Sequence, residues 1–366
     1  MLVRIFDNYN MSIEKISLLK TKSDPMYNIS IIVPVYNAEA TIQRTLQSLI
    51  DQTLPDIEII CIDDGSTDSS LKIMTFMQSK YPKRINILTG LNQGVYKARA
   101  RGIEAARGRF IAFCDSDDTV EPSMYETLFS KAEETDADLT VCAYWRQEKN
   151  KILSTEMQHS ELTQCNIDPE SGWFVSVNTA VWNKLFKANI AQHYIEFQQP
   201  PRITEDALFL FSLCPYIGTI AFVDKPLYHY YINNSTAMKT ISLKDAIVIR
   251  NAWKELRFAF QKKHAKYIPI IDLAAFIHLG LSLPLIMVKT HNASLKNYLR
   301  DIRKSLDKDF TTFKDSRFLK LSYVFKHHVW MTLPFLASVL YKMRLICPAL
   351  KTYDFLTTIF RKDLKW

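Results

Sequence analysis

A run of carboxylates, Asp115-Ser116-Asp117-Asp118, directly follows the apolar segment 109–114. A short apolar run rich in strand-forming residues predicts a buried strand, and the carboxyl end of such a strand is where open α/β sheets bind ligands. Carboxylates crowded there repel one another unless a cation lies between them. Because ions such as Mg²⁺ bind one or two carboxylates together with phosphate oxygens, the run indicates a metal site for a phosphorylated substrate. A solvated turn that caps the next helix is the alternative.

A second acidic pair, Asp63-Asp64, ends another apolar segment and is followed by Gly65, a turn residue. If the two segments are parallel strands, both acidic groups emerge at the same edge of the sheet. An Asp side chain there could accept hydrogen bonds from a nucleobase imide or from ribose hydroxyls. A dinucleotide-binding site is not indicated, because residues 34–37 read PVYN where the GxGxxG pattern would be expected.

The elements that must position these groups are readable between residues 29 and 144. Strands are predicted at 29–35, 57–62, 85–89, 110–114 and 139–144, and helices at 38–50, 67–77, 95–106 and from Pro122 onward, with Asn37 as the cap of the first helix. This alternation predicts a mostly parallel, doubly wound sheet. The pattern weakens after residue 150, and helical periodicity dominates from residue 242 to the end.

Charge is unevenly distributed along the 366 residues. Residues 1–240 hold 23 Lys and Arg against 29 Asp and Glu, a net of −6, whereas residues 241–366 hold 23 against 9, a net of +14. The basic C-terminal third indicates an anionic partner such as a lipid surface, an acidic glycan or a nucleic acid. A solvated basic helix face is the alternative. Nucleic acid is the least favoured partner, because the region has no recognisable reading motif.

Cysteine usage and hydropathy bear on the compartment. The six cysteines show no CxxC spacing. Since Cys61, Cys114 and Cys142 lie in apolar strand-like segments, buried thiols in a reducing cytosol are expected. Residues 1–28 carry scattered charges and no continuous apolar core, so no signal peptide is predicted. The most apolar stretch, 267–288, contains an Asp and two prolines, so a buried helix or helix pair is expected there rather than a membrane span.

Four motifs in order resemble those of glycosyltransferase family 2. They are IIVPVYN at 31–37, IDDGSTDSS at 62–70, NQG with a following AR at 92–99, and FCDSDD at 113–118. Weaker similarity continues through WNKLF at 182–186, EDALF at 205–209 and YHY at 228–230, so the resemblance covers residues 29–236. It implies the GT-A fold, a Rossmann-like, doubly wound mixed sheet. It also implies an inverting transferase that uses sugar-nucleotide donors.

The resemblance implies a donor site at the ends of the first strands. Pro34, Tyr36 and Asp64 should line the nucleoside pocket, with the Asp64 carboxylate accepting the uracil N3–H. Asp63 should support the same loop. Arg99 should approach the donor phosphates.

The acidic run then becomes the metal-binding DxD motif of this family. Asp115 and Asp117 are expected to bind Mn²⁺ or Mg²⁺, with Asp117 as the more direct ligand and Asp115 and Ser116 also contacting the donor. The metal would neutralise charge that develops on the departing nucleoside diphosphate. Asp118 is expected to cap the following turn rather than bind the ion.

The acceptor side needs a base to deprotonate the attacking hydroxyl. Glu205 and Asp206 precede an apolar helical run, so they are expected at a helix N-terminus, where the dipole favours carboxylates. The resemblance makes Asp206 the expected base and Glu205 the second choice or a sugar contact. Trp182 is either a sugar-stacking platform or a core residue, and His229 is expected to be a packed strand histidine rather than a metal ligand. Tyr231 stands where the family often has an Arg.

These inferences predict three regions. They are an N-terminal extension at 1–28, a GT-A domain at 29–240 with a nucleotide-sugar half at 29–145 and an acceptor half at 146–240, and a basic helical region at 241–366. The predicted activity is the transfer of one hexosyl or N-acetylhexosaminyl group from a UDP-sugar to a glycan or lipid-linked acceptor in surface polysaccharide or glycolipid synthesis. The expected location is the cytoplasm or the cytoplasmic face of an anionic membrane. The alternative is a catalytically silent binding subunit of a glycan-assembly complex, which the retained carboxylates argue against.

Overall fold

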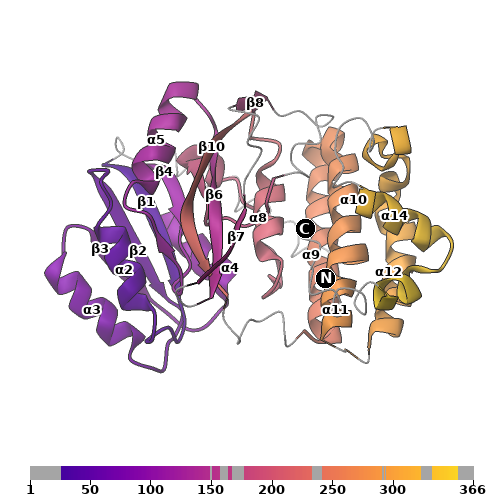
Figure 1. Cartoon of the computed structure of the whole chain (residues 1–366), viewed down its shortest axis with the longest axis horizontal. Coiled ribbons are helices and arrows are strands. Elements are labelled where there is room, and N and C mark those ends of the chain that lie inside the picture. The colour runs from indigo at the N-terminus through magenta and orange to yellow at the C-terminus, as the bar shows by residue number, and fades with distance from the viewer. Residues whose placement is uncertain are drawn as a thin grey trace.

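The computed structural model describes residues 26–148, 151–156, 164–166, 177–232, 241–290, 292, 294–322 and 332–352. Most of the predicted N-terminal extension lies outside these residues. Within them, the chain forms a mixed sheet with helices on both faces, followed by a group of C-terminal helices that lies against one side of the sheet region (Figure 1).

The described strands form one mixed sheet in the order β3-β2-β1-β4-β9-β6-β10-β5, with β7 paired to β6 and β8 paired to β10. Their bounds are β1 Tyr27–Val35, β2 Ile57–Asp63, β3 Ile85–Thr89, β4 Gly108–Phe113, β5 Thr119–Val120, β6 Leu139–Glu148, β7 Lys151–Glu156, β8 Gln164–Asn166, β9 Lys184–Lys187 and β10 Thr219–Tyr231. β2 and β4 flank β1 in parallel, whereas β9 runs antiparallel between β4 and β6. The predicted doubly wound mixed sheet is therefore confirmed, although the sequence pattern did not predict β9.

The helices have the bounds α2 Ile42–Ile50, α3 Ser70–Lys80, α4 Val95–Ala105, α5 Met124–Thr135, α7 Ala188–Ala191, α8 Glu205–Leu213, α9 Leu243–Lys263, α10 Ile268–Ile277, α11 Leu283–Lys289, α12 Leu295–Asp309 and α14 Thr332–Lys342. One face of the sheet packs against α2, α3 and α5. The other face packs against α4 and α8. Apolar residues on these helices and on both faces of the strands fill two cores, as a two-sided sheet requires.

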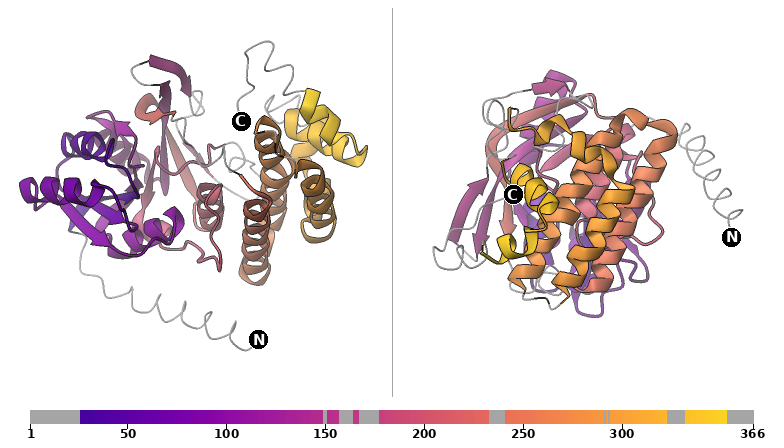
Figure 2. Two further views of the ribbon diagram at one scale, coloured as in Figure 1. Left: turned by 90° about the horizontal axis from the view of Figure 1, so that it is seen from below. Right: turned by 90° about the vertical axis from the view of Figure 1, so that its right-hand side faces the viewer.

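The C-terminal helices continue one of these cores. Buried residues of α8, α9 and α10 belong to the same apolar cluster as the sheet face next to α4, and Figure 2 shows the helices stacked beside the sheet region. One helical stretch, Ala265–Lys289, is long and apolar enough to cross a membrane, and 78% of its most apolar window is buried inside the protein. The sequence predicted a buried helix or helix pair at 267–288, and the structure has one continuous buried helix in which the π-helical turn His278–Ser282 joins α10 and α11.

The predicted buried thiols are also confirmed. Cys61, Cys114 and Cys142 are free and buried. Burial raises the pKa of Cys61 and of Cys142 to about 12, so neither thiol is ionised near neutral pH.

A buried carboxylate ties the amino-terminal end of the sheet together. Glu58 on β2 is fully buried and accepts hydrogen bonds from the Ser30 hydroxyl at 2.6 Å and from the Arg107 backbone N–H at 2.8 Å. The Arg107 guanidinium adds an ion pair at 2.9 Å. These contacts join β1, β2 and the turn before β4, far along the strands from the acidic loops.

We predict that Glu58→Ala lowers the free energy of unfolding by about 2–3 kcal/mol, because hydrogen bonds to a charged group are lost and the Ser30 hydroxyl is left buried. Urea denaturation measures the change. Glu133→Ala is the matched control, since its ion pair with Arg109 is at the surface with both side chains more than 40% exposed and should be worth under about 1 kcal/mol. Equal losses in the two variants would contradict this account of Glu58.

Candidate active site

A cavity of about 810 Å³ opens at the carboxyl ends of β1, β2 and β4. It is lined by Pro34, Val35, Tyr36, Asn37, Ala38, Ala40, Thr41, Asp64, Val95, Ala98, Arg99, Asp115, Ser116, Asp117 and Glu205. The parallel register of the three strands explains why residues far apart in the sequence meet here. Most of the residues predicted for the donor and metal sites share this cavity, whereas Asp63, Asp206 and Trp182 do not line it.

The nucleoside side of the cavity is built by two loops. Asp64 follows β2 and is buried, and its carboxylate accepts hydrogen bonds from the backbone N–H groups of Gln93 at 2.9 Å and Gly94 at 2.8 Å. Asp63 accepts the Ser66 N–H at 3.2 Å. Both carboxylates therefore fix loops, and Asp64 also faces the cavity, where its remaining lone pairs can accept a ligand donor.

Asn37 does not cap the first helix, contrary to the prediction. It has a left-handed backbone with φ 50°, and its side-chain oxygen accepts the Thr67 N–H at 2.8 Å. The helix begins later, at Ile42. Asn37 thus joins the loop after β1 to the loop after β2, a role that the local sequence could not indicate because Thr67 is thirty positions away.

Arg99 on α4 is the central cation of the site. Its buried guanidinium donates to Asp115 at 2.9 Å and to Glu205 at 3.3 Å, and it forms a further short contact with Asp206. Burial disfavours the charged form, yet the attraction of these three carboxylates raises the pKa of Arg99 above its ordinary value. Arg99 therefore connects the acidic loop after β4 to the carboxylates of α8 across one side of the cavity.

The acidic loop is held by elements on both sides. The hydroxyl of Thr45 on α2 donates to the carbonyls of Ser116 at 3.0 Å and Asp118 at 2.8 Å. Arg44 on the same helix donates to the Asp117 carbonyl at 2.6 Å, and its guanidinium lies 4.0 Å from the centre of the Tyr231 ring. A cation from α2 thus stands beside the loop on the side where Tyr231 replaces the arginine frequent in the family.

The carboxylate of Asp118 is hydrogen-bonded to β10 and not to the following turn, so its predicted role as a cap of that turn is wrong. It is fully buried and accepts hydrogen bonds from the Tyr228 hydroxyl and the Tyr231 N–H, both at 2.8 Å. Burial, with Asp117 and Asp115 nearby, raises the pKa of Asp118 well above its usual range. The Tyr228 hydroxyl also accepts the Asp115 N–H at 3.2 Å, so β10 braces the loop from below.

Glu205 and Asp206 form the first turn of α8, as predicted. The helix starts after Thr204, which has a left-handed backbone (φ 66°). Glu205 lines the cavity, whereas Asp206 contacts Arg99 and accepts the Val181 N–H. Burial raises the pKa of Asp206 against the opposing effect of Arg99. Burial and the neighbouring Asp206 raise the pKa of Glu205 to about 8.

The donor set suits a hard divalent ion that shares its coordination with a substrate. Asp115 and Asp117 both line the cavity and offer carboxylate oxygens. Among the described residues, no three His, Cys, Asp or Glu side chains gather closely enough to form an all-protein metal cage. Mg²⁺-like ions are commonly bound by one or two carboxylates plus phosphate oxygens and water, so this pair fits such an ion.

Two aromatic residues singled out in the sequence belong to the core. Trp182 is 6% exposed and stacks on Tyr228 with ring centres 4.4 Å apart, so it is the core residue of the two alternatives and has no open face for a sugar. His229 uses one ring nitrogen toward Gln147 at 3.0 Å and the other toward Glu121 at 2.7 Å. It is therefore the expected packed strand histidine.

Three residues that support the site escaped the sequence analysis. Arg44 and Tyr228 hold the acidic loop, and Lys184 on β9 is completely buried close to Asp206. Lys184 lies in the WNKLF motif and Tyr228 in the YHY motif, so the sequence marked both residues but did not indicate what they do. Arg44 lies in an ordinary amphipathic helix and carried no signal.

The sequence of this chain is similar to those of known glycosyltransferases. The model of the family described as "Glycosyl transferase family 2" matches residues 30–211. The putative glycosyltransferase EpsH of Bacillus subtilis is 33% identical over 225 residues, which cover 59% of this chain and 64% of EpsH. The poly(ribitol-phosphate) beta-glucosyltransferase of Bacillus spizizenii is 35% identical over 185 residues, covering 50% of this chain and 28% of that protein. The chain thus spans less than two thirds of the length of these relatives.

Among solved structures, S. aureus TarS 1-349 in complex with UDP-GlcNAc aligns with a TM-score of 0.65 at 16% identity, covering 92% of this chain and 93% of that one. At this identity the alignment demonstrates a common fold. The chain has the GT-A fold, and the alignment includes the C-terminal helices as well as the sheet.

We predict that Glu205→Gln changes how stability depends on pH. The pKa of Glu205 is about 8 in the folded protein, against an ordinary value of 4.5. Above pH 8 the folded protein must therefore hold a buried negative charge, which lowers its stability. The contribution of Glu205 should therefore lower the free energy of unfolding of the wild type as the pH rises from 4.5 to about 8. The variant should not show this decrease. Relative to wild type, the variant should gain at least ~1.4 kcal/mol between these two pH values, the equivalent of one pKa unit.

Urea denaturation at both pH values measures this difference. Glu133→Gln, which removes an exposed carboxylate, is the control and should follow the wild type. Parallel curves for wild type and Glu205→Gln would show that Glu205 ionises normally.

Proposed function

The chain belongs to glycosyltransferase family 2, whose model matches residues 30–211, and on this premise we propose that it is an inverting transferase. It transfers one sugar from a UDP-sugar to a hydroxyl group of a glycan or of a lipid-linked acceptor. The observation that carries the proposal is the cavity that brings Asp64, Arg99, Asp115, Asp117 and Glu205 together. A buried cation and acidic groups from two elements share this cavity, which supports the binding of a nucleoside diphosphate sugar.

The donor half of the proposal rests on the loops after β1, β2 and β4. Pro34 and Tyr36 form one wall for the nucleoside, and Asp64 presents an acceptor for the base N–H. Arg99 provides positive charge toward the diphosphate. UDP as the nucleotide is supported by the complex of the structurally similar TarS with UDP-GlcNAc.

Asp115 and Asp117 would hold a Mn²⁺ or Mg²⁺ ion, which would act as a Lewis acid toward the leaving diphosphate when bound. In the transfer itself, the acceptor oxygen attacks the anomeric carbon, the bond from that carbon to the diphosphate oxygen breaks, and its electron pair leaves with the diphosphate. The hydroxyl proton passes to Asp206, which we assign as the base. Glu205 is the second candidate, because it faces the cavity and its pKa of about 8 lies near neutral pH.

The proposed acceptor class is supported by one relative and by the basic C-terminal region. A relative from Bacillus spizizenii is a poly(ribitol-phosphate) beta-glucosyltransferase, which supports a surface glycopolymer or its lipid-linked precursor as the acceptor. An enzyme that draws on nucleotide sugars would work in the cytoplasm, on the cytoplasmic face of the membrane when its acceptor is lipid-linked.

We predict that, in a panel of UDP-glucose, UDP-N-acetylglucosamine, UDP-galactose and GDP-mannose, one UDP-sugar is bound and slowly hydrolysed in the presence of Mn²⁺. Asp117→Ala should abolish the dependence on Mn²⁺. Asp206→Asn should keep donor affinity and lower the rate of transfer by at least about 100-fold, the usual contribution of a general base. Calorimetry measures donor binding, and release of UDP measures turnover.

Asp51→Asn is the matched control, because it removes an exposed carboxylate outside the cavity and should change neither quantity. A loss confined to Glu205→Gln, with Asp206→Asn active, would move the base to Glu205. Binding of a donor without hydrolysis or transfer under any condition would favour the silent binding subunit.

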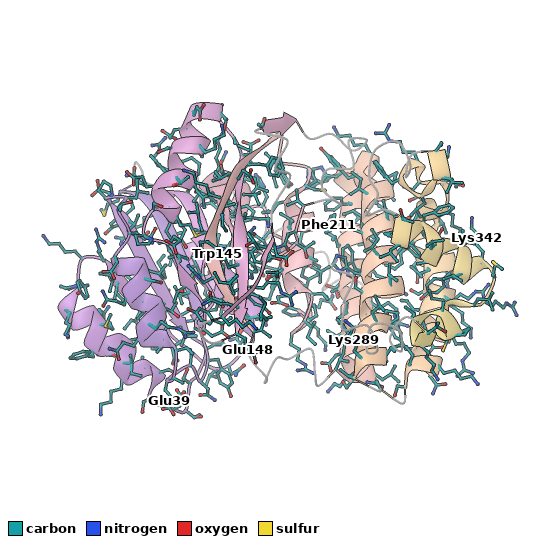
Figure 3. The ribbon with its side chains drawn as sticks, in the orientation of Figure 1. Glu39, Trp145, Glu148, Phe211, Lys289 and Lys342 are labelled. Atoms are coloured by element: carbon teal, nitrogen blue, oxygen red, sulfur yellow. The ribbon has the colours of Figure 1, made fainter. Side chains whose placement is uncertain are left out.

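The surface at the end of α14 fits an anionic bilayer. The turn 342–345 alternates exposed basic and apolar side chains, Lys342, Met343, Arg344 and Leu345. Figure 3 shows Lys342 at the end of the molecule far from the sheet. An apolar groove of about 150 Å³ lies beside this turn, between α14 and α11, with Leu336 at its rim. Basic residues next to exposed apolar ones are the pattern of a membrane-surface contact.

We predict that Lys342→Glu/Arg344→Glu weakens binding to phosphatidylglycerol-containing vesicles by at least about 10-fold, since each basic residue near such a surface contributes about 1 kcal/mol. Vesicle sedimentation measures binding, with pure phosphatidylcholine vesicles as the uncharged reference. Lys72→Glu/Lys80→Glu on α3 changes the net charge equally at the other end of the molecule and should leave binding unchanged. If both variants bound the vesicles equally weakly, the effect would be one of net charge, and the end of α14 would not be the membrane contact.

A further inference from the structure

Lys184 is a buried charge for which the donor site offers no purpose. It begins β9, is completely buried, and is among the largest side chains with no exposure. Burial lowers the pKa of its ammonium to about 7. Removing an ammonium from water is costly unless neighbouring groups compensate, and a strongly perturbed group beside a cavity marks a functional candidate.

The contacts of Lys184 lead to Asp206. Its ammonium donates to the Ala180 carbonyl at 2.6 Å and to the Asn183 side-chain oxygen at 2.8 Å. The Ala180 carbonyl and the Val181 N–H belong to one peptide group, and that N–H donates to the Asp206 carboxylate. One peptide unit therefore lies between the ammonium of Lys184 and the carboxylate of Asp206.

This arrangement has a directional electrostatic effect. A cation on the carbonyl oxygen polarises the peptide and strengthens the N–H donor at its other end. The positive charge of Lys184 also favours the ionised form of Asp206 through space. The other charged groups around Asp206 are Arg99 of α4, Asp115 after β4 and Glu205 of α8, so Lys184 is the cation that acts from the β9 side.

We propose that Lys184 is a positioning residue for Asp206, which holds and polarises the 180–181 peptide so that the carboxylate stays ionised and oriented toward the acceptor hydroxyl. This inference rests on the proposed glycosyl transfer with Asp206 as its base. It assigns the lysine of the WNKLF motif a part in acceptor activation, although its side chain does not line the cavity.

Asn183 provides a control that keeps the charge of Lys184, because its side chain anchors the same turn and contacts the ammonium only as a neutral acceptor. Removing it leaves the contact between the ammonium and the Ala180 carbonyl in place. The Asn183 amide donates to the Cys142 carbonyl at 2.6 Å, and the Cys142 N–H donates to the Asn183 carbonyl at 3.0 Å. A purely structural role for this turn would therefore give Asn183 and Lys184 variants the same phenotype. An electrostatic role separates them.

The experiment compares Lys184→Met, which keeps the length and apolar volume of the side chain, with Asn183→Ala. In Lys184→Met, we expect the donor KM to stay unchanged, kcat to fall about 10-fold, and the acid limb of the kcat profile to move up by about half to one pH unit, because Asp206 becomes harder to ionise. In Asn183→Ala, we expect lower thermal stability with the acid limb in its wild-type position. An unshifted acid limb in Lys184→Met would overturn the proposal.

A second measurement does not depend on whether Lys184→Met folds. In protein labelled with ¹³C-lysine, the pH titration of the Lys184 ε-carbon should move to lower pH in Asp206→Asn, since loss of the neighbouring negative charge disfavours the ammonium. An identical titration in wild type and Asp206→Asn would overturn the coupling. Absence of transfer by the wild type with every donor would instead refute the proposed function, and the titration would still test the link between the two residues.

Discussion

The mutual repulsion of carboxylates gathered around Arg99 is the constraint on which this site depends. Asp115 comes from the loop after β4, and Glu205 and Asp206 come from the start of α8, so they approach from different elements. Arg99 offsets the repulsion by contacting all three. Because its guanidinium is planar with donors on several sides, it can serve carboxylates in different directions, which a lysine could not do equally well. The donor side and the acceptor side are thus joined electrostatically before any ligand binds.

Arg99 can perform this role only because the sheet brings α4 and α8 to the same face. Strand β9 is inserted antiparallel between β4 and β6, and the chain then returns through α7 to α8. Residues 207–213 of α8 are buried on every side, because the helix lies between the sheet and α9 (Figure 1). Phe209 packs against Phe113 on the sheet side, and Phe211 packs against Trp253 of α9. The C-terminal helices therefore help to fix the helix that carries Glu205 and Asp206.

The sequence predicted what local pattern determines and missed what distant contacts decide. The short apolar runs and the turn residues that follow them located the parallel strands, so Asp64 and Asp115 could be assigned to one edge of the sheet. Asp118 could not be understood in the same way, because its partners lie on β10, more than a hundred residues away. The two readings of Trp182 were separable only once Tyr228 was seen to cover its ring. Lys184 carried a motif signal, but its purpose depends on which peptide its ammonium meets.

The two carboxylates at the start of α8 show how one helix end can separate the tasks of adjacent residues. Successive positions in a helix point about 100° apart, so Glu205 lines the cavity, while Asp206 accepts the Val181 N–H and shares Arg99 with Glu205. Both carboxylates gain from the helix dipole and from Arg99. Glu205 accepts the backbone N–H of its own residue, whereas Asp206 accepts that of Val181, from outside the helix. A base must be ionised before the acceptor arrives, and buried charge is stabilised by fixed dipoles that need no reorganisation. On this reasoning Asp206 is the better-prepared base, although Glu205 is closer to the open space.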